Sequence, residues 1–161
     1  TYGFLHDPDS VMHLFFNGLA LYQFGPRVEN SLGTRRFTTY YFTCLVGAGL
    51  CQLLVTSVMV GSGEQAFPTI GASGAIFGIL LAYGMMFPRD RVMLLIPPIP
   101  MSARTLVIVF GVIELVLGIT GTASGIAHFA HLGGILFGWL LIRYWRGDPP
   151  FKPKRRGPWG V

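Results

Sequence analysis

A single serine lies among small residues in the stretch Ile70-Gly71-Ala72-Ser73-Gly74-Ala75-Ile76-Phe77-Gly78. The stretch opens an apolar run that continues to residue 87, which predicts a helix with Ser73 near its start. A serine in apolar surroundings is usually a packing residue whose hydroxyl bonds back to its own helix. The role of Ser73 therefore depends on which other polar side chains reach the same place.

The chain of 161 residues has the composition of a membrane protein. Only 12% of its residues are charged, 52% are hydrophobic and the mean hydropathy is +0.56, whereas a soluble domain is roughly 25% charged. The net charge of +5 would suit nucleic acid, but the basic residues cluster beside apolar runs instead of forming a stripe. We therefore expect the lipid bilayer as a partner, and no nucleic acid.

Hydrophobic runs predict an all-α polytopic membrane protein with five transmembrane helices, at about 11–25, 37–60, 70–87, 105–120 and 126–145. Gly25-Pro26 is expected to end the first helix, with a polar turn over 27–36. Prolines make 88–104 an expected interfacial loop. The membrane domain is predicted to cover 1–146, and the basic, Pro-rich segment 147–161 to be a disordered tail.

The charged residues support this count of spans. With five spans, all 12 Lys and Arg fall on one side of the membrane, in segments 25–36, 88–104 and 143–161. The other side holds only acidic charges, at Asp7, Asp9 and Glu64. The positive-inside rule makes the basic side, with the C-terminus, cytoplasmic. Compact basic loops and the absence of an organelle-targeting segment predict a bacterial inner membrane.

Three of the predicted helices carry polar groups at a similar depth. His13 and Asn17 lie in the first turns of the first helix, Ser73 starts the third, and His131 is one to two turns into the last. At about 1.5 Å per residue, these groups lie several ångströms below the same surface. Polar groups in lipid are costly and usually face a partner or a water-filled cavity. We therefore expect them to meet in one site.

The pair Ser73 and His131 has the chemistry of a nucleophile and its base. Gly74-xxx-Gly78 follows the serine and Gly134-xxx-Gly138 follows the histidine, and small residues at this spacing let two helix backbones approach closely. Phe77, one turn after Ser73, is expected to pack against the ring of His131. The two helices should therefore meet just below the reactive groups.

Acyl transfer also needs donors for the negative charge that develops on the carbonyl oxygen. One candidate is the backbone N–H of Ser73, at a helix N-terminus with its positive dipole end. The side chains of His13 and Asn17, spaced i and i+4 on one helix face, are two more.

Taken together, these motifs resemble the rhomboid intramembrane serine proteases. The resemblance runs from about Thr1 to Trp145 and rests on four ordered elements: His13-Leu-Phe-Phe-Asn17, Gly25-Pro-Arg-Val-Glu29 with Leu32-Gly33, Gly71-Ala72-Ser73-Gly74, and Ala130-His131-Leu132-Gly133-Gly134. The family core has six helices, so this chain is expected to lack the first.

The resemblance implies a serine endopeptidase that cleaves transmembrane segments of membrane proteins through an acyl-enzyme, without metal or organic cofactor. It makes Ser73 and His131 the catalytic pair. The expected oxyanion site is His13, Asn17 and Ser73, with supporting roles for Gly71, Gly74, Phe77 and Gly134. The helix at 105–120 would correspond to the mobile lateral gate for a transmembrane substrate.

Two further polar residues are assigned less specific roles. His128, three residues before His131, could form a metal pair with it. However, no His-Glu-x-x-His motif or nearby acidic ligand is visible, so we predict no metal and expect His128 to line the mouth of the site. Glu114 has no basic residue at its depth, and a structural role is favoured.

Two other functions remain open at this stage. The same fold could be a catalytically inactive, rhomboid-like protein that binds membrane clients, although a binder has no need for both Ser73 and His131. A small transporter or channel component would place polar groups along a path to both faces, whereas here the cluster opens to one side only. A serine-reactive probe that never labels Ser73 would favour the client-binding protein. Flux in proteoliposomes that is unaffected by changes at Ser73 would favour the transporter.

Overall fold

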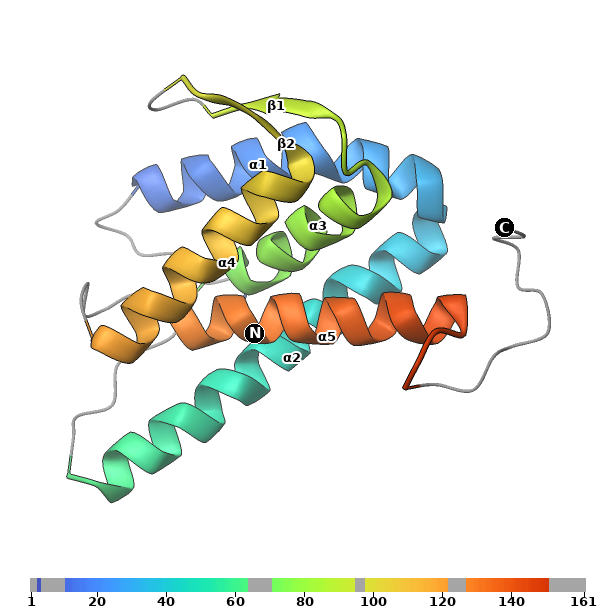
Figure 1. Ribbon diagram of the computed structural model, residues 1–161. Helices are drawn as coiled ribbons and strands as arrows, with labels where there is room; N and C mark the ends of the chain where they lie inside the picture. The colour runs from blue at the N-terminus through green and yellow to red at the C-terminus, as the bar shows by residue number, and fades with distance from the viewer. Residues whose placement is uncertain (1–2, 4–10, 64–70, 95–97, 122–126, 151–161) are drawn as a thin grey trace.

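The computed structural model describes residues 3, 11–63, 71–94, 98–121 and 127–150. Within these ranges it is mostly helical, as predicted (Figure 1). The elements are α1 (Val11–Leu32), α2 (Thr34–Gly61), α3 (Ser73–Met86), β1 (Arg91–Met93), β2 (Pro100–Ser102), α4 (Ala103–Thr120) and α5 (His128–Arg146). The expected acidic charges at Asp7, Asp9 and Glu64, and most of the predicted tail, lie outside the described residues.

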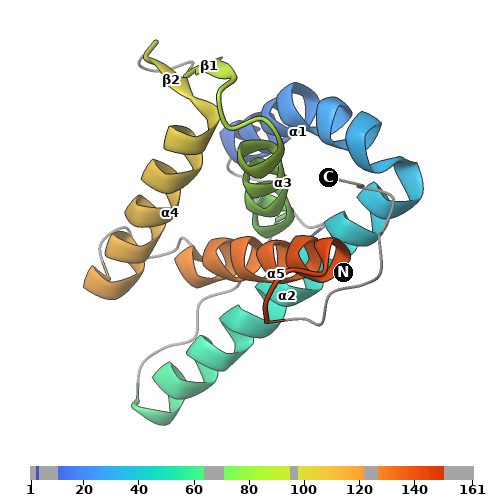
Figure 2. The same cartoon turned by 45° about the vertical axis from the view of Figure 1, so that its right-hand side comes forward.

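Helix α3 is the centre of the bundle. It packs against each of the other four helices, and the two views show it enclosed by them (Figures 1 and 2). Nine of its 14 residues are buried, most of them small or aliphatic. At about 1.5 Å per residue, the helix is roughly 21 Å long, shorter than the ~30 Å hydrocarbon core of a bilayer. A Cβ at Gly74 would meet that of Ala48, near the middle of α2, so Ser73 begins well inside the length of that neighbouring helix.

Two helices, α2 and α4, are long and apolar enough to cross a bilayer by length and composition. Large apolar side chains stand exposed on both: Leu54 of α2 is 70% exposed and Ile119 of α4 is 71% exposed. Such surface is stable only against lipid or another apolar partner. That α1, α3 and α5 also span the membrane remains a prediction.

The prediction that Gly25-Pro26 ends the first helix is wrong. Helix α1 continues through Pro26 to Leu32, and only Gly33, with φ of +79°, separates it from α2. Proline removes one helical hydrogen bond, but Val28 and Leu32 in the following turns are buried in the core. The predicted polar turn over 27–36 is therefore two helix ends joined by one residue.

The segment predicted as an interfacial loop, 88–104, also contains regular structure. Strands β1 and β2 pair antiparallel, with Val92 opposite Met101, and Val92 is buried in the core while its neighbours in β1 are exposed. Pro100 begins β2, a position where a strand tolerates the missing N–H. The purely α class predicted from the sequence therefore requires the addition of this short hairpin.

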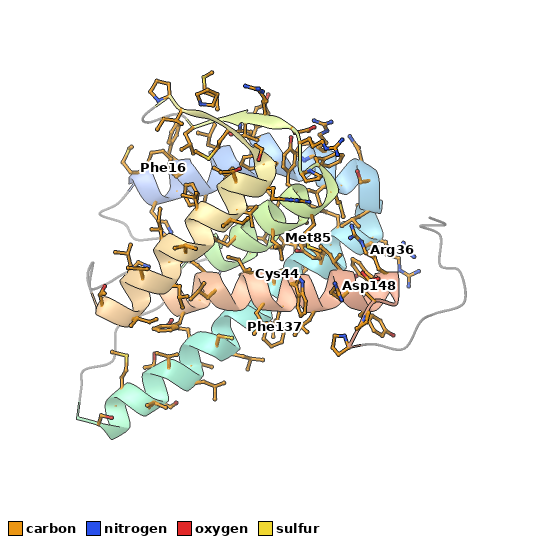
Figure 3. The ribbon with its side chains drawn as sticks, viewed as in Figure 1. Phe16, Arg36, Cys44, Met85, Phe137 and Asp148 are labelled. Atoms are coloured by element: carbon orange, nitrogen blue, oxygen red, sulfur yellow. The ribbon has the colours of Figure 1, made fainter. Side chains whose placement is uncertain are left out.

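Close packing of α3, α2 and α5 depends on glycine. A Cβ at Gly134 would overlap the backbone carbonyl oxygen of Gly74, and a Cβ at Gly78 would lie 3.2 Å from the carbonyl oxygen of Gly134. Cys44 and Phe137, labelled in Figure 3, lie where α2 meets α5, each against a glycine of the other helix. The predicted approach of the two glycine-bearing helices is confirmed.

Tyr40 joins α2 to the same region. Its side chain is fully buried, and its hydroxyl donates a 2.7 Å hydrogen bond to the carbonyl oxygen of Gly78. We expect Tyr40→Phe to lower the free energy of unfolding by about 1–2 kcal/mol, because a buried hydrogen bond is lost. Tyr22, 80% exposed, supplies the control: Tyr22→Phe should change it by less than about 0.5 kcal/mol. Equal effects in a denaturant titration in detergent would contradict this.

Candidate active site

The Ser73 hydroxyl is directed at another helix. By contrast, the exposed hydroxyls of Ser31, Ser57 and Ser62 bond back to the carbonyl four residues earlier, the local bond usual for helical serines. The Oγ of Ser73 lies 2.8 Å from Nε2 of His131 on α5. The serine is half-buried and the histidine is 8% exposed. This is the distance that proton transfer from a hydroxyl to an imidazole requires.

The ring of His131 is held on one face by Phe77. The two rings stack with centroids 4.3 Å apart and planes 12° from parallel. Phe77 lies one turn after Ser73 on α3, so the same helix supplies both the hydroxyl and the surface on which the imidazole rests. This is the contact expected from the sequence, and it restricts the ring to orientations that keep Nε2 toward Ser73.

The predicted oxyanion residues approach from α1. A Cβ at Gly71 would lie 2.6 Å from Cε1 of His13, so the imidazole occupies the space that a side chain there would need. Gly71 also has φ of +105°, a conformation that L side chains rarely adopt. The Nδ2 of Asn17 is buried without a hydrogen-bond partner among the described residues. A buried donor without a partner is costly, and it is what an oxyanion site holds ready.

The backbone supplies a further donor. Helix α3 begins at Ser73, and the first intrahelical hydrogen bond of its opening turn runs from the N–H of Ile76 to the carbonyl of Ala72. The N–H of Ser73 therefore precedes the helical ladder, as the first N–H groups of any helix do. The positive end of the helix dipole lies at the same place.

Glu114 of α4, for which the sequence favours a structural role, lies beside this pair. Its Oε2 lies 2.7 Å from Nδ1 of His128 and 2.9 Å from Nδ1 of His131. The contact with His128 has hydrogen-bond geometry. The contact with His131 is short, but its geometry is not that of a hydrogen bond. The buried Nδ1 of His131 therefore has no hydrogen-bond partner among the described residues. All three residues are buried, with no more than 8% of any of them exposed.

The prediction that His128 lines the mouth of the site is also wrong, because its side chain is only 6% exposed. Local spacing could not reveal its partner, which lies 14 residues earlier on another helix. The sequence does carry one signal of this contact. Glu114 is within two turns of the end of α4 and both histidines are in the first turn of α5, the next helix in the chain, so the adjoining helix ends hold all three residues.

The three side chains include the ligand types of a metal centre, and their ligand atoms lie within 4.8 Å of one another. Two ligands of a tetrahedral metal with bonds of about 2.0–2.1 Å are roughly 3.3 Å apart. The separations from Oε2 to the two imidazole nitrogens, 2.7 and 2.9 Å, are shorter. They match hydrogen bonds to a carboxylate better than joint coordination of an ion.

An apolar cavity of about 360 Å³ adjoins the pair. It lies between α1, α3, α4 and the hairpin, and its lining includes Phe16, Phe77, Leu106 and Phe110. Phe16 is labelled at the edge of α1 in Figure 3. Phe77 lines the cavity and stacks on the ring of His131, so one side chain separates the cavity from that histidine.

Comparison with known proteins gives consistent matches. The Rhomboid domain model matches residues 1–147. The chain is similar to the mitochondrial Rhomboid protein 1 of Saccharomyces cerevisiae, 30% identical over 146 residues that cover 81% of this chain and 38% of that protein. It is 29% identical to the mitochondrial Presenilin-associated rhomboid-like protein A of Danio rerio over 170 residues, 94% of this chain and 42% of that protein.

A bacterial protein matches as well. Rhomboid protease GluP of Bacillus subtilis is 33% identical over 130 residues, which cover 81% of this chain and 22% of that protein. The chain thus spans about four-tenths or less of the length of these relatives. No solved structure matches it significantly.

The relatives contradict the predicted bacterial inner membrane, and with it the cytoplasmic assignment of the basic side. The proteins matched in yeast, zebrafish and rat carry names that place them in mitochondria. The prediction rested on compact basic loops and on the absence of a targeting segment. Neither feature distinguishes a bacterial membrane from an organelle membrane that sorts charge by the same rule.

Proposed function

Since the chain belongs to the rhomboid family, we propose that it is an intramembrane serine endopeptidase that cleaves transmembrane segments of membrane proteins. The observation that carries the proposal is the 2.8 Å contact between Ser73 Oγ and His131 Nε2. The two groups come from different helices, and the Ser73 hydroxyl contacts His131, whereas those of Ser31 and Ser57 bond back to their own helices. The reaction class is acyl transfer through a serine ester.

The reaction proceeds in two halves. In the first, the proton of the Ser73 hydroxyl passes to Nε2 of His131 as the Oγ–C bond to the substrate carbonyl forms. The C–N bond then breaks, and His131 returns the proton to the leaving amine. In the second half, water gives a proton to His131 and its oxygen attacks the ester. The acid leaves, and the proton returns to Oγ of Ser73.

Access of water and substrate follows from the position of α3. Ser73 begins a helix of 14 residues and is half-buried, so water from the adjacent surface has a short path to it. The apolar cavity beside Phe77 fits an apolar stretch of a transmembrane substrate. Helix α4, which lines this cavity and buries few of its residues, serves as the lateral gate in this proposal.

The proposal is tested with a fluorophosphonate probe that reacts with activated serines. In lipid or detergent, we expect the unaltered chain to be labelled and both Ser73→Ala and His131→Ala to lose the label. The catalytically inactive, client-binding alternative predicts that Ser73 is never labelled. Labelling that persists in His131→Ala would contradict the role of His131 as the base.

Asn17 supplies a prediction for the oxyanion site. Because its Nδ2 is buried without a partner, we expect Asn17→Ala to lower kcat for cleavage of a transmembrane reporter by about 10- to 100-fold, with little change in KM. Asn30→Ala, which truncates an exposed asparagine on the same helix, is the matched control and should leave both constants within about twofold. A loss confined to KM would assign Asn17 to substrate binding instead.

The mitochondrial relatives support a mitochondrial membrane as the location of this protein. The proposal keeps residues 1–146 as one membrane domain with five spans and 147–161 as a basic tail. Fractionation of cells of the source organism, followed with an antibody to the chain, tests the location. A protein found with plasma-membrane markers would overturn it.

A further inference from the structure

Glu114 is an unusual residue for its helix. Among the described side chains of α4, only Ala103, Leu106 and Glu114 are buried, while most large apolar residues around Glu114 are exposed. The single carboxylate of α4 thus faces the bundle, and aliphatic side chains face outward. A buried carboxylate is costly unless it is hydrogen-bonded and paired. Its surroundings therefore show what it interacts with.

The tautomer of His131 requires an acceptor on the side opposite Ser73. To take the Ser73 proton, Nε2 must be unprotonated, and a neutral imidazole then carries its hydrogen on Nδ1. That nitrogen is 2.9 Å from Oε2 of Glu114. A carboxylate there stabilises this tautomer, and it also stabilises the imidazolium that forms when the proton arrives.

The alignment of this contact is imperfect, although its distance is short. Distance already favours the bond, and only the direction of the N–H falls short. Catalytic hydrogen bonds are often poorly aligned without substrate and become aligned as the reaction proceeds.

His128 fixes the carboxylate from the other side. Its Nδ1 lies 2.7 Å from the same oxygen with good geometry, and its ring is nearly perpendicular to that of His131, at 89° with centroids 6.5 Å apart. The Nδ1 atoms of two histidines thus lie within 2.9 Å of one carboxylate oxygen, and that of His128 is hydrogen-bonded to it. His128, the first residue of α5, therefore holds the Glu114 carboxylate in place by this contact.

We propose that Glu114 is a positioning residue that orients His131, so that Ser73, His131 and Glu114 form a triad contributed by α3, α5 and α4. The inference rests on the proposed function, because it assigns Glu114 a role through the same base. It differs from a merely structural tie between α4 and α5. A structural tie would contribute to the free energy of unfolding. Its loss would not depend on whether residue 114 is charged, and it would not lower kcat specifically.

The test is steady-state cleavage of a transmembrane reporter by the full chain in lipid vesicles. We expect Glu114→Gln to lower kcat by about 100-fold with KM within about twofold, because the amide loses the charge and can present its NH2 to Nδ1, which favours the wrong tautomer. Glu114→Asp keeps the charge and should recover at least about tenfold of that loss. Glu29→Gln, the same change at the far end of α1, should match the unaltered chain.

The outcomes separate the hypotheses. A Glu114→Gln variant that retains kcat within about threefold overturns the triad while the labelling of Ser73 leaves the proposed function intact. Equal losses in Glu114→Gln and Glu114→Asp, accompanied by a lower melting temperature, also overturn it and indicate a structural tie. If Glu114→Gln does not fold, Glu114→Asp decides: kcat no better than that of His131→Ala overturns the triad. Cleavage that persists in Ser73→Ala overturns both proposals.

Discussion

Ser73→Ala is expected to lower kcat for a transmembrane reporter by at least about 10⁴-fold and to remove all fluorophosphonate labelling. Under the proposed function, the substitution removes the atom that forms the acyl bond, while His131 and the proposed oxyanion donors remain. Removal of the nucleophile from a serine-histidine pair eliminates nearly the whole contribution of the pair, since its members act as a unit. Binding of the reporter should be unchanged. The substitution removes only the hydroxyl oxygen, and the Cβ that remains as a methyl group keeps the apolar contacts of the serine.

The matched control for this change is Ser31→Ala. Ser31 is exposed, and its hydroxyl bonds back to the carbonyl of Arg27, the ordinary arrangement for a helical serine. Activity, labelling and the melting temperature should therefore match those of the unaltered chain. If Ser73→Ala cleaved the reporter as fast as Ser31→Ala, Ser73 would be a packing serine after all and the proposed function would fail.

Gly134→Ala is expected to have the largest effect on stability, at least about 3 kcal/mol in the free energy of unfolding. The added Cβ would overlap the carbonyl oxygen of Gly74, and a backbone atom cannot rotate away as a side chain can. The two helices must separate, which opens a gap along their whole contact, and overpacking in a close-packed interior costs about 1–3 kcal/mol even where side chains can adjust. Reversible unfolding in mixed detergent micelles measures the change.

Gly18→Ala is the control for this prediction. A Cβ at Gly18 meets nothing within 4 Å, and alanine is favoured over glycine in a helix by about 0.8–1.0 kcal/mol. Gly18→Ala should therefore leave stability unchanged or raise it. If both variants were equally stable, the contact between α3 and α5 would be looser than described.

The sequence carried enough information to predict the pairing of Ser73 with His131. Each residue precedes two glycines one helical turn apart, and that spacing decides which helix faces approach closely. The stacking of Phe77 on His131 was likewise predictable, because a residue one turn after Ser73 must lie on the same face. These contacts follow from local periodicity, which a single sequence records well.

Other features depend on tertiary contacts that periodicity does not record. Proline ends many helices, but at Pro26 the burial of Val28 and Leu32 outweighs the lost hydrogen bond, and α1 continues. Glu114 appeared isolated because its partners lie on a helix that follows a link, and the direction of its side chain around α4 could not be read from a stripe of uniformly apolar neighbours. The identity of the membrane could not be predicted from the sequence. The distribution of basic residues indicates which side of a membrane a loop occupies, but it does not indicate which organelle the membrane belongs to.

The glycine contact between α3 and α5 has a consequence for how the protein responds to its lipids. No side chain separates Gly74 from Gly134. The distance between Ser73 and His131 is therefore set by direct contact between the backbones of α3 and α5. Thicker or thinner bilayers tilt helices whose long apolar faces meet lipid, and α2 and α4 are long and apolar enough to present such faces. The serine and its base should therefore keep their separation across membranes of different thickness. The cavity wall and the carboxylate that α4 contributes would follow the bilayer.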